Sequence, residues 1–441
     1  MKRLLSLLLC AVLALFCATT AQAAGVSITL TASEYALHYA FDAGAQDPFV
    51  ILEYTTPAEK GWMMLYSADG HFEGDVSLAY SGAGGKTSVA LTSARTTGSI
   101  GKASTTLPKA ADYQKPTGKS NAKVTDFVLT ETPEGFHYAF NAIGTDYMLL
   151  YWRSKEQTVT QPVYPDENGH YEGDVVSELT FARTQFTVQV KSGSGSMKKE
   201  ATVRKGYQAP EAPQRQEGRL SGVTVCIDAG HQENGRFVNE PIGPGLTGST
   251  SGKGGMAQGT KTNRRESIVC LEIGMLLRDE LLRQGANVIM TREDQTTFHT
   301  NIERCEIAEA GGAQIMLRLH CNNSSNRSKR GIQVYGPLNS DYAKAVADAD
   351  TYREMGQKLL DAMKTRVGMT LANSTGMVRL NDNYVGNNWA KMMCFLVEMG
   401  YLSNPAEEYL LVTPVYQQWL AEGMVDGVYE IAVARGWVQA Q

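Results

Sequence analysis

Several features that define other classes of protein are scarce in this sequence. The chain has 7 cysteines in 441 residues, and Cys10 and Cys17 fall within the first 23. Five remain, an odd number that argues against a disulfide-stabilised scaffold and favours buried free thiols. The formal net charge is −5 and no basic stripe is present, which argues against a nucleic-acid-binding protein.

The apolar run at the N-terminus is shorter than a membrane-spanning helix requires. Lys2 and Arg3 precede an apolar run from Leu4 to Phe16, and small residues follow up to Ala23. A membrane-spanning helix needs about 20 apolar residues. We therefore expect residues 1–23 to be a signal peptide cleaved after Ala23, so that the protein is secreted with no stable membrane anchor. Lipid attachment at Cys17 is disfavoured by the bulky Leu15-Phe16 before it.

An internal repeat dominates the first half of the chain. His38-Tyr-Ala-Phe recurs 99 residues later at His137, and Gly70-His-Phe-Glu-Gly-Asp-Val recurs as Gly169-His-Tyr-Glu-Gly-Asp-Val at the same offset. Asp-Gly and Asn-Gly pairs between short alternating runs are strong hairpin signals. The fold class predicted for this half is therefore two duplicated all-β sandwich-like modules.

Proline-bearing stretches divide the chain further. We predict repeat 1 at 24–106, a linker at 107–121, repeat 2 at 122–206, a second linker at 207–218 and a final domain at 219–441. In the final domain strand-like and helix-like segments alternate. This pattern predicts an α/β domain with a mainly parallel sheet covered by helices.

Four short stretches of the final domain suggest one metal site. His231, His320 and Glu398 each follow an apolar, strand-like run, and Glu266 opens a strongly helical one. Groups just past the carboxyl ends of parallel strands converge on one crevice. Two imidazoles and a carboxylate form a catalytic zinc site with an open position, and a second carboxylate can take a proton from water. The four residues therefore predict a zinc hydrolase.

Each of these residues also has a structural interpretation. His231 fits a satisfied strand-end histidine, and Asn263-x-x-Glu266 fits a helix capping box with Glu266 at its third position. Glu398 is harder to explain structurally, because a carboxylate after a buried strand needs a cation, a donor or a role. Cys321, beside His320, is rejected as a ligand because neighbouring side chains on a strand point to opposite faces.

The duplicated histidines could be taken for a second metal site. They occur as equivalent pairs without a carboxylate or cysteine at ligand spacing in the sequence. We therefore expect structural roles for them, and the four residues are His38, His71, His137 and His170.

At these motifs the final domain resembles the zinc-dependent N-acetylmuramoyl-L-alanine amidases, also called the amidase type 3 family. The resemblance runs from Leu220 to the C-terminus and leaves residues 24–219 uncovered. Two features depart from the family pattern: Gln232 stands where glycine is usual, and 232–265 is long and glycine-rich. A long loop that joins two site residues favours a rim over the substrate. The matching motifs are Ile-Asp-Ala-Gly-His231, Glu266-Ser-Ile-Val-Cys-Leu, Val-Ile-Met-Thr-Arg292, Leu-Arg-Leu-His320-Cys-Asn322 and Val-Glu398-Met-Gly-Tyr-Leu-Ser-Asn404-Pro-Ala-Glu.

The resemblance implies roles for single residues. His231, Glu266 and His320 would be the ligands of one zinc ion per chain, and Glu398 would be the catalytic acid and base. Asn322 or Arg292 would hold substrate or the oxyanion, with backbone amides as alternatives.

The resemblance also implies a substrate and a reaction. The substrate would be peptidoglycan, cut between N-acetylmuramic acid and the L-alanine of the stem peptide by a secreted, wall-associated enzyme. A zinc peptidase or deacetylase acting on the wall, or a non-catalytic wall-binding protein, are the alternatives. The sequence does not define the role of the repeats or the oligomeric state.

Overall fold

The computed structural model divides the chain into two compact units, Met1–Gly206 and Tyr207–Gln441. Each unit is described by itself. The expected signal peptide lies outside the described residues except for 19–21. The described residues are 19–21, 25–78, 80–111, 113, 123–132, 135–143, 148–153, 158–176, 185–191, 197–204, 209–232, 238–250, 255–262, 264–368 and 377–440.

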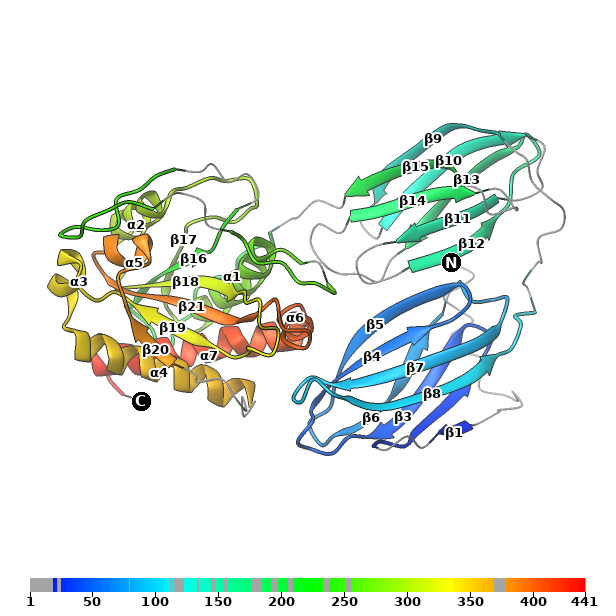
Figure 1. Cartoon of the computed structure of the whole chain (residues 1–441). Helices are drawn as coiled ribbons and strands as arrows, with labels where there is room; N and C mark the ends of the chain where they lie inside the picture. The colour runs from blue at the N-terminus through cyan, green and yellow to red at the C-terminus, as the bar shows by residue number, and fades with distance from the viewer. Residues whose placement is uncertain are drawn as a thin grey trace. The chain divides into compact units, whose positions relative to one another are not determined.

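The N-terminal unit is built from strands in its described part, as predicted (Figure 1). They form sheets in the orders β1-β2-β3-β6, β13-β10-β9 and β15-β14-β11-β12-β5-β4-β7-β8. The strands are β1 (Thr19–Ala21), β2 (Ile28–Ala32), β3 (Ala36–Asp42), β4 (Phe49–Thr55), β5 (Glu59–Tyr66), β6 (His71–Ser77), β7 (Gly85–Ser93), β8 (Ser99–Leu107), β9 (Lys123–Thr132), β10 (Gly135–Ile143), β11 (Met148–Arg153), β12 (Thr158–Val163), β13 (His170–Val176), β14 (Gln185–Lys191) and β15 (Met197–Arg204).

Equivalent positions of the sequence repeat occupy equivalent positions in the sheets. His38 is the antiparallel partner of Asp75, and His137 is the partner of Asp174. One apolar core gathers residues from Ile28 to Leu107, and a second gathers residues from Phe136 to Val190. The duplicated sandwich-like modules, and the module and linker boundaries, stay predictions. The two halves meet in the longest sheet, where Val159 of β12 pairs with Glu59 of β5.

The C-terminal unit alternates strands and helices. Its strands are β16 (Thr224–Ala229), β17 (Asn287–Met290), β18 (Ile315–Asn322), β19 (Gln333–Gly336), β20 (Met377–Leu380) and β21 (Met393–Tyr401). Its helices are α1 (Glu266–Arg283), α2 (Asn301–Ala310), α3 (Asp341–Val346), α4 (Ala349–Val367), α5 (Val385–Trp389), α6 (Glu407–Leu411) and α7 (Pro414–Ala434).

The six strands form one sheet in the order β17-β16-β18-β21-β19-β20. All neighbours in this sheet are parallel except β19 and β21, so the sheet is mixed with parallel pairs in the majority. The α/β class is confirmed, and the one antiparallel pair refines the prediction of a mainly parallel sheet.

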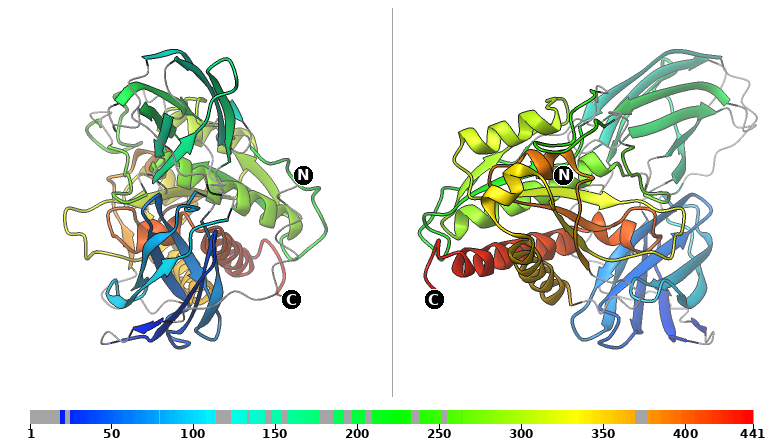
Figure 2. Two further views of the ribbon diagram at one scale, coloured as in Figure 1. Left: turned by 90° about the vertical axis from the view of Figure 1, so that its right-hand side faces the viewer. Right: turned by 60° about the vertical axis from the view of Figure 1, so that its left-hand side comes forward.

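Helices cover both faces of this sheet. Ile227 and Ala229 of β16 face α1 at Gly274, while Asp228 between them faces Arg304 of α2. Helices α4 and α7 pack together, as Figures 1 and 2 show, and Gly427 lets α7 approach the backbone of Leu359 closely. Within the described part of the chain, no helix combines the length and apolar character of a membrane span.

Two strand ends lie further along the chain than the sequence pattern indicates. Strand β18 runs to Asn322 and β21 runs to Tyr401, so His320 and Glu398 lie inside strands rather than after them. Parallel neighbours continue to pair there, which extends both strands. Helix α2 is capped by Thr300, whose hydroxyl accepts the backbone N–H of Glu303 in a capping box.

Candidate metal centre

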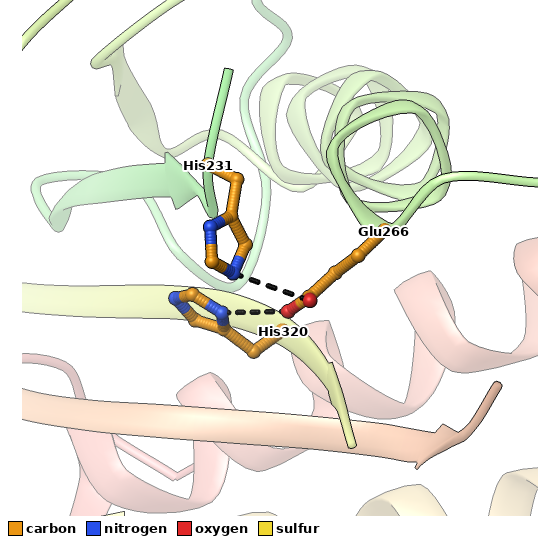
Figure 3. A group of neighbouring side chains, drawn as sticks. All are labelled: His231, Glu266 and His320. Carbon is orange, nitrogen blue, oxygen red and sulfur yellow. Dashed lines mark hydrogen bonds and ion pairs between the residues drawn. The ribbon is translucent and has the colours of Figure 1, made fainter. Parts of the chain in front are cut away.

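Three predicted residues form one cluster at the end of the sheet (Figure 3). One ligand atom each from His231, Glu266 and His320 lies within 4.8 Å of the others. The Nε2 atom of His231 is 3.2 Å from Oε2 of Glu266, and Nδ1 of His320 is 2.8 Å from Oε1 of the same carboxylate. Among the described residues, no other group of three histidine, cysteine or acidic side chains meets this distance limit.

The chain places His231 by an unusual backbone conformation. Its φ is 57°, in the left-handed region that non-glycine residues rarely adopt. Two buried arginines hold the carbonyls around it: Arg292 donates to the carbonyls of Ala229 and Gly230, and Arg304 donates to those of Ala229 and His231. Hydrogen bonds to the carbonyls around it hold His231 in this strained backbone conformation.

Glu266 is the first residue of α1 and is 3% exposed. Besides the two histidines, it accepts the backbone N–H of Cys321 on Oε1 at 3.1 Å and that of Ala257 on Oε2 at 2.7 Å. Burial raises the pKa of Glu266, but hydrogen bonds from His231 and His320 outweigh burial and hold it well below its usual range. The carboxylate is therefore ionised and held on both oxygens.

The expected capping box at this helix is wrong. The N-cap of α1 is Arg265, with no side-chain capping bond, so Glu266 stands at the first helical position rather than the third. Asn263, the proposed cap, lies outside the described residues. An anionic first-turn side chain still interacts well with the helix dipole.

Glu398 lies one strand away from the cluster. It is the register partner of His320 across β18 and β21, so both side chains leave the same face of the sheet. Its Oε2 atom is buried and has no hydrogen-bond partner among the described residues. Burial, with the nearby Glu266 carboxylate adding to it, raises the pKa of Glu398 to about 8. Such a carboxyl group is suited to exchange a proton with a reacting group.

The cluster fits a zinc ion by its chemistry. Two imidazole nitrogens and a carboxylate oxygen form a known ligand set of catalytic zinc. The imidazoles of His231 and His320 are 24% and 14% exposed, which leaves a side of the cluster accessible. The unpartnered oxygen of Glu398 beside it is a further indication that a charged group or water belongs there.

The other predicted site residues have different surroundings. Arg292 is 2% exposed, and its guanidinium donates to the carbonyls of Ala229, Gly230 and Ser267, so it holds the segment before His231. Its part in binding substrate stays a prediction. Asn322 donates to Gln333 at 3.1 Å at the end of β18. Gln232, where the sequence departs from the family pattern, accepts a hydrogen bond from Arg304.

Part of the long 232–265 loop is described, and it is anchored. Glu240 accepts the backbone N–H of Ile302 and the side-chain amide of Asn301 at the start of α2. Asn388 and Trp389 donate to carbonyls of the same segment.

The sequence analysis missed a buried ion cluster beneath the site. Asp228 is fully buried and contacts both Arg304 and Arg318, with Nε of Arg318 2.8 Å from Oδ2 of Asp228. Burial raises the pKa of Asp228, but the two guanidinium groups outweigh it and hold this pKa well below its usual range. The sequence does carry a signal for this cluster, because Asp228 and Arg318 are charged residues inside strands that are otherwise apolar. The five described cysteines are free and buried, as expected.

Residues 225–430 match the sequence model of a family described as N-acetylmuramoyl-L-alanine amidase. The C-terminal unit belongs to this amidase family. The chain is 26% identical over 231 residues to the germination-specific N-acetylmuramoyl-L-alanine amidase of Bacillus subtilis, a match that spans 49% of this chain and 83% of that protein. It is 27% identical over 218 residues to the probable cell wall amidase LytH of Staphylococcus aureus, spanning 48% of this chain and 60% of LytH.

Solved structures of similar proteins include two amidases. One is the N-acetylmuramoyl-L-alanine amidase of Clostridium difficile 630, with a TM-score of 0.38 and 24% identity over 48% of this chain and 96% of that one. Another is apo Ami1 of Mycobacterium abscessus, with a TM-score of 0.43 and 20% identity over 48% and 99% of the two chains.

Proposed function

We propose that the chain is a zinc-dependent N-acetylmuramoyl-L-alanine amidase that acts on peptidoglycan. The observation that carries the proposal is the pairing of a three-residue ligand cluster with Glu398 one strand away, whose Oε2 atom is buried and has no hydrogen-bond partner among the described residues. The family match and the relatives named as amidases support the bond specificity, which the ligand set alone does not define.

His231, Glu266 and His320 would hold one zinc ion, which supplies the Lewis acidity for amide hydrolysis when bound. Glu398 takes a proton from the attacking water and returns it to the leaving amine of L-alanine. The backbone amides of Ala257 and Cys321 hold the Glu266 carboxylate, and they would keep this ligand in orientation.

Export and action at the wall are part of the same proposal. The N-terminal run with Lys2 and Arg3 supports a signal peptide, and peptidoglycan lies outside the cytoplasmic membrane. The N-terminal unit would then accompany the amidase unit to the wall as a duplicated pair of β modules.

Mass spectrometry of digested peptidoglycan tests the reaction. We expect purified protein to release stem peptides with new L-alanine amino termini, and a chelator to stop the release until zinc is restored. Release of acetate or of cleaved cross-links instead would indicate a deacetylase or a peptidase. Stable binding to the wall without any product would indicate a non-catalytic wall-binding protein.

A further inference from the structure

A buried carboxylate on α6 holds a turn that lies far from it in the sequence. Oε2 of Glu408 accepts the backbone N–H groups of Lys261 at 2.8 Å and Thr262 at 3.2 Å, and Oε1 accepts the hydroxyl of Thr260 at 3.1 Å. Glu408 is 0% exposed, as is Thr262. A carboxylate that is buried with its donors satisfied fixes their positions firmly.

The turn is the tip of a short hairpin. Its described arms are residues 257–259 and 264–266, and we call them with the turn the 257–266 hairpin. Gly259 donates to the carbonyl of Arg264 and Glu266 donates to that of Ala257, both at 2.9 Å. Gln258 and Arg265 form an antiparallel bridge between these bonds. Two hydrogen-bonded arms therefore join the turn to Glu266.

The far end of the hairpin contacts the metal ligand directly. The backbone N–H of Ala257 donates to Oε2 of Glu266 at 2.7 Å, and Ala257 is 3% exposed. The second backbone donor to this carboxylate, Cys321, lies in the central strand β18, between His320 and Asn322, which both pair with β21. Of these two donors, the Ala257 N–H is the one whose position depends on a loop.

From these contacts we infer that Glu408 is a positioning residue for the metal ligand Glu266, acting through the 257–266 hairpin. This inference rests on the proposed zinc site. Glu408 fixes the turn, the turn aligns the arms, and the arms hold the Ala257 N–H against the ligand oxygen. Groups that orient a ligand in this way typically change metal affinity about 10- to 100-fold when removed.

Zinc affinity of the full-length chain, measured by competition with a chromogenic chelator, tests the inference. Glu408→Leu removes every acceptor at the turn, and we expect zinc binding to weaken about 10- to 100-fold. Glu408→Gln keeps one oxygen for the N–H groups of Lys261 and Thr262, so we expect it to stay within about threefold of the parent. Glu408→Asp withdraws the oxygens by one methylene, and we expect it to weaken zinc binding as well. This variant carries the test should the leucine variant fail to fold.

Glu240→Leu is the matched control. Glu240 is also a buried carboxylate, 5% exposed, that ties the same connection to a helix, but it binds the start of α2 rather than the 257–266 hairpin. We expect Glu240→Leu to lower thermal stability and to leave zinc affinity unchanged. Hydrogen exchange in residues 257–262 of the metal-free chain should rise in Glu408→Leu and Glu408→Asp but not in Glu240→Leu.

Two results would overturn the inference. One is parental zinc affinity in the leucine and aspartate variants of Glu408. The other is an equal loss in Glu240→Leu, which would point to general destabilisation. A parent chain that binds no zinc would instead overturn the proposed function, so the two failures are distinguishable.

Discussion

Glu398 is the register partner of His320 in adjacent parallel strands of the amidase unit. Side chains at paired positions leave the same face of a sheet at the same height. This relationship brings a carboxylate whose Oε2 atom is buried and has no hydrogen-bond partner among the described residues to the edge of the three-residue metal cluster, without making it part of that cluster. The two acidic residues of the site therefore have separate surroundings and, in the proposed mechanism, separate roles.

Glu398→Gln should separate catalysis from metal binding. The amide is nearly isosteric but takes no proton, so we expect kcat to fall roughly 10²- to 10⁴-fold while zinc content stays at one per chain. Steady-state kinetics on a soluble muropeptide, with metal analysis of the same sample, checks this. A variant that turns over like the parent would make Glu398 structural, and one that loses zinc would make it a ligand.

His231→Ala and His320→Ala should each remove most of the bound zinc, because three protein ligands are the minimum for such a site. His299→Ala is the control, since His299 lies in the same unit but outside the ligand cluster. Elemental analysis after dialysis measures the outcome. Full zinc occupancy in the doubly substituted chain would contradict the ligand assignment.

The sequence predicts the reactive residues of the site better than the backbone conformation and strand register that position them. His231, Glu266, His320 and Glu398 stand out because polar groups next to apolar strands or at a helix start need an explanation. The left-handed backbone of His231 and the register of β18 with β21 depend on tertiary pairing, which local pattern does not encode. Strands β18 and β21 continue past their apolar runs for the same reason.

The duplicated histidines show a similar limit. The sequence shows no carboxylate at ligand spacing from them, but in the fold His38 Nδ1 lies 3.1 Å from Asp75 and His137 Nδ1 lies 2.9 Å from Asp174. These partners are 37 residues apart in the chain and meet only through cross-strand register. The structural role of these histidines stays a prediction, and their carboxylate partners could not be found from sequence spacing.

Gly230→Ala should damage the site without removing a ligand. A Cβ atom at Gly230 would lie 2.5 Å from the carbonyl oxygen of Leu319 and 2.6 Å from the His320 ring. We expect the displaced ring to weaken zinc binding roughly tenfold or more, a loss typical of disturbed ligand support. Gly274→Ala is the control, because its Cβ would meet its nearest neighbour at 3.5 Å. Equal zinc affinity of the two variants would show that His320 tolerates the contact.

Asp228→Asn should destabilise the amidase unit strongly. It leaves the guanidinium groups of Arg304 and Arg318 buried without their counter-charge, which typically costs about 3–5 kcal/mol. The pKa of Asp228 is lower in the folded chain than the value of about 3.9 expected when the chain is unfolded. The ionised carboxylate therefore stabilises the folded state fully at pH values above about 3.9. This stabilisation is lost as the pH falls toward the folded pKa. Urea unfolding of parent and variant should therefore converge at acid pH, and a pH-independent difference would contradict this account.

The N-terminal unit should be dispensable for the reaction but not for action on intact wall. The chain separates into compact units at residues 206 and 207, and the ligand cluster with Glu398 lies entirely in the second. We expect residues 207–441 alone to fold, bind one zinc ion and cleave a soluble muropeptide at close to the parental rate. Circular dichroism and metal analysis check folding, and parallel assays on the muropeptide and on intact sacculi measure the two activities.

A loss on sacculi alone would support wall targeting by the N-terminal unit, because linked binding surfaces raise the effective concentration of enzyme at its substrate. A folded, zinc-loaded fragment that fails on the soluble substrate would show instead that the N-terminal unit takes part in the reaction.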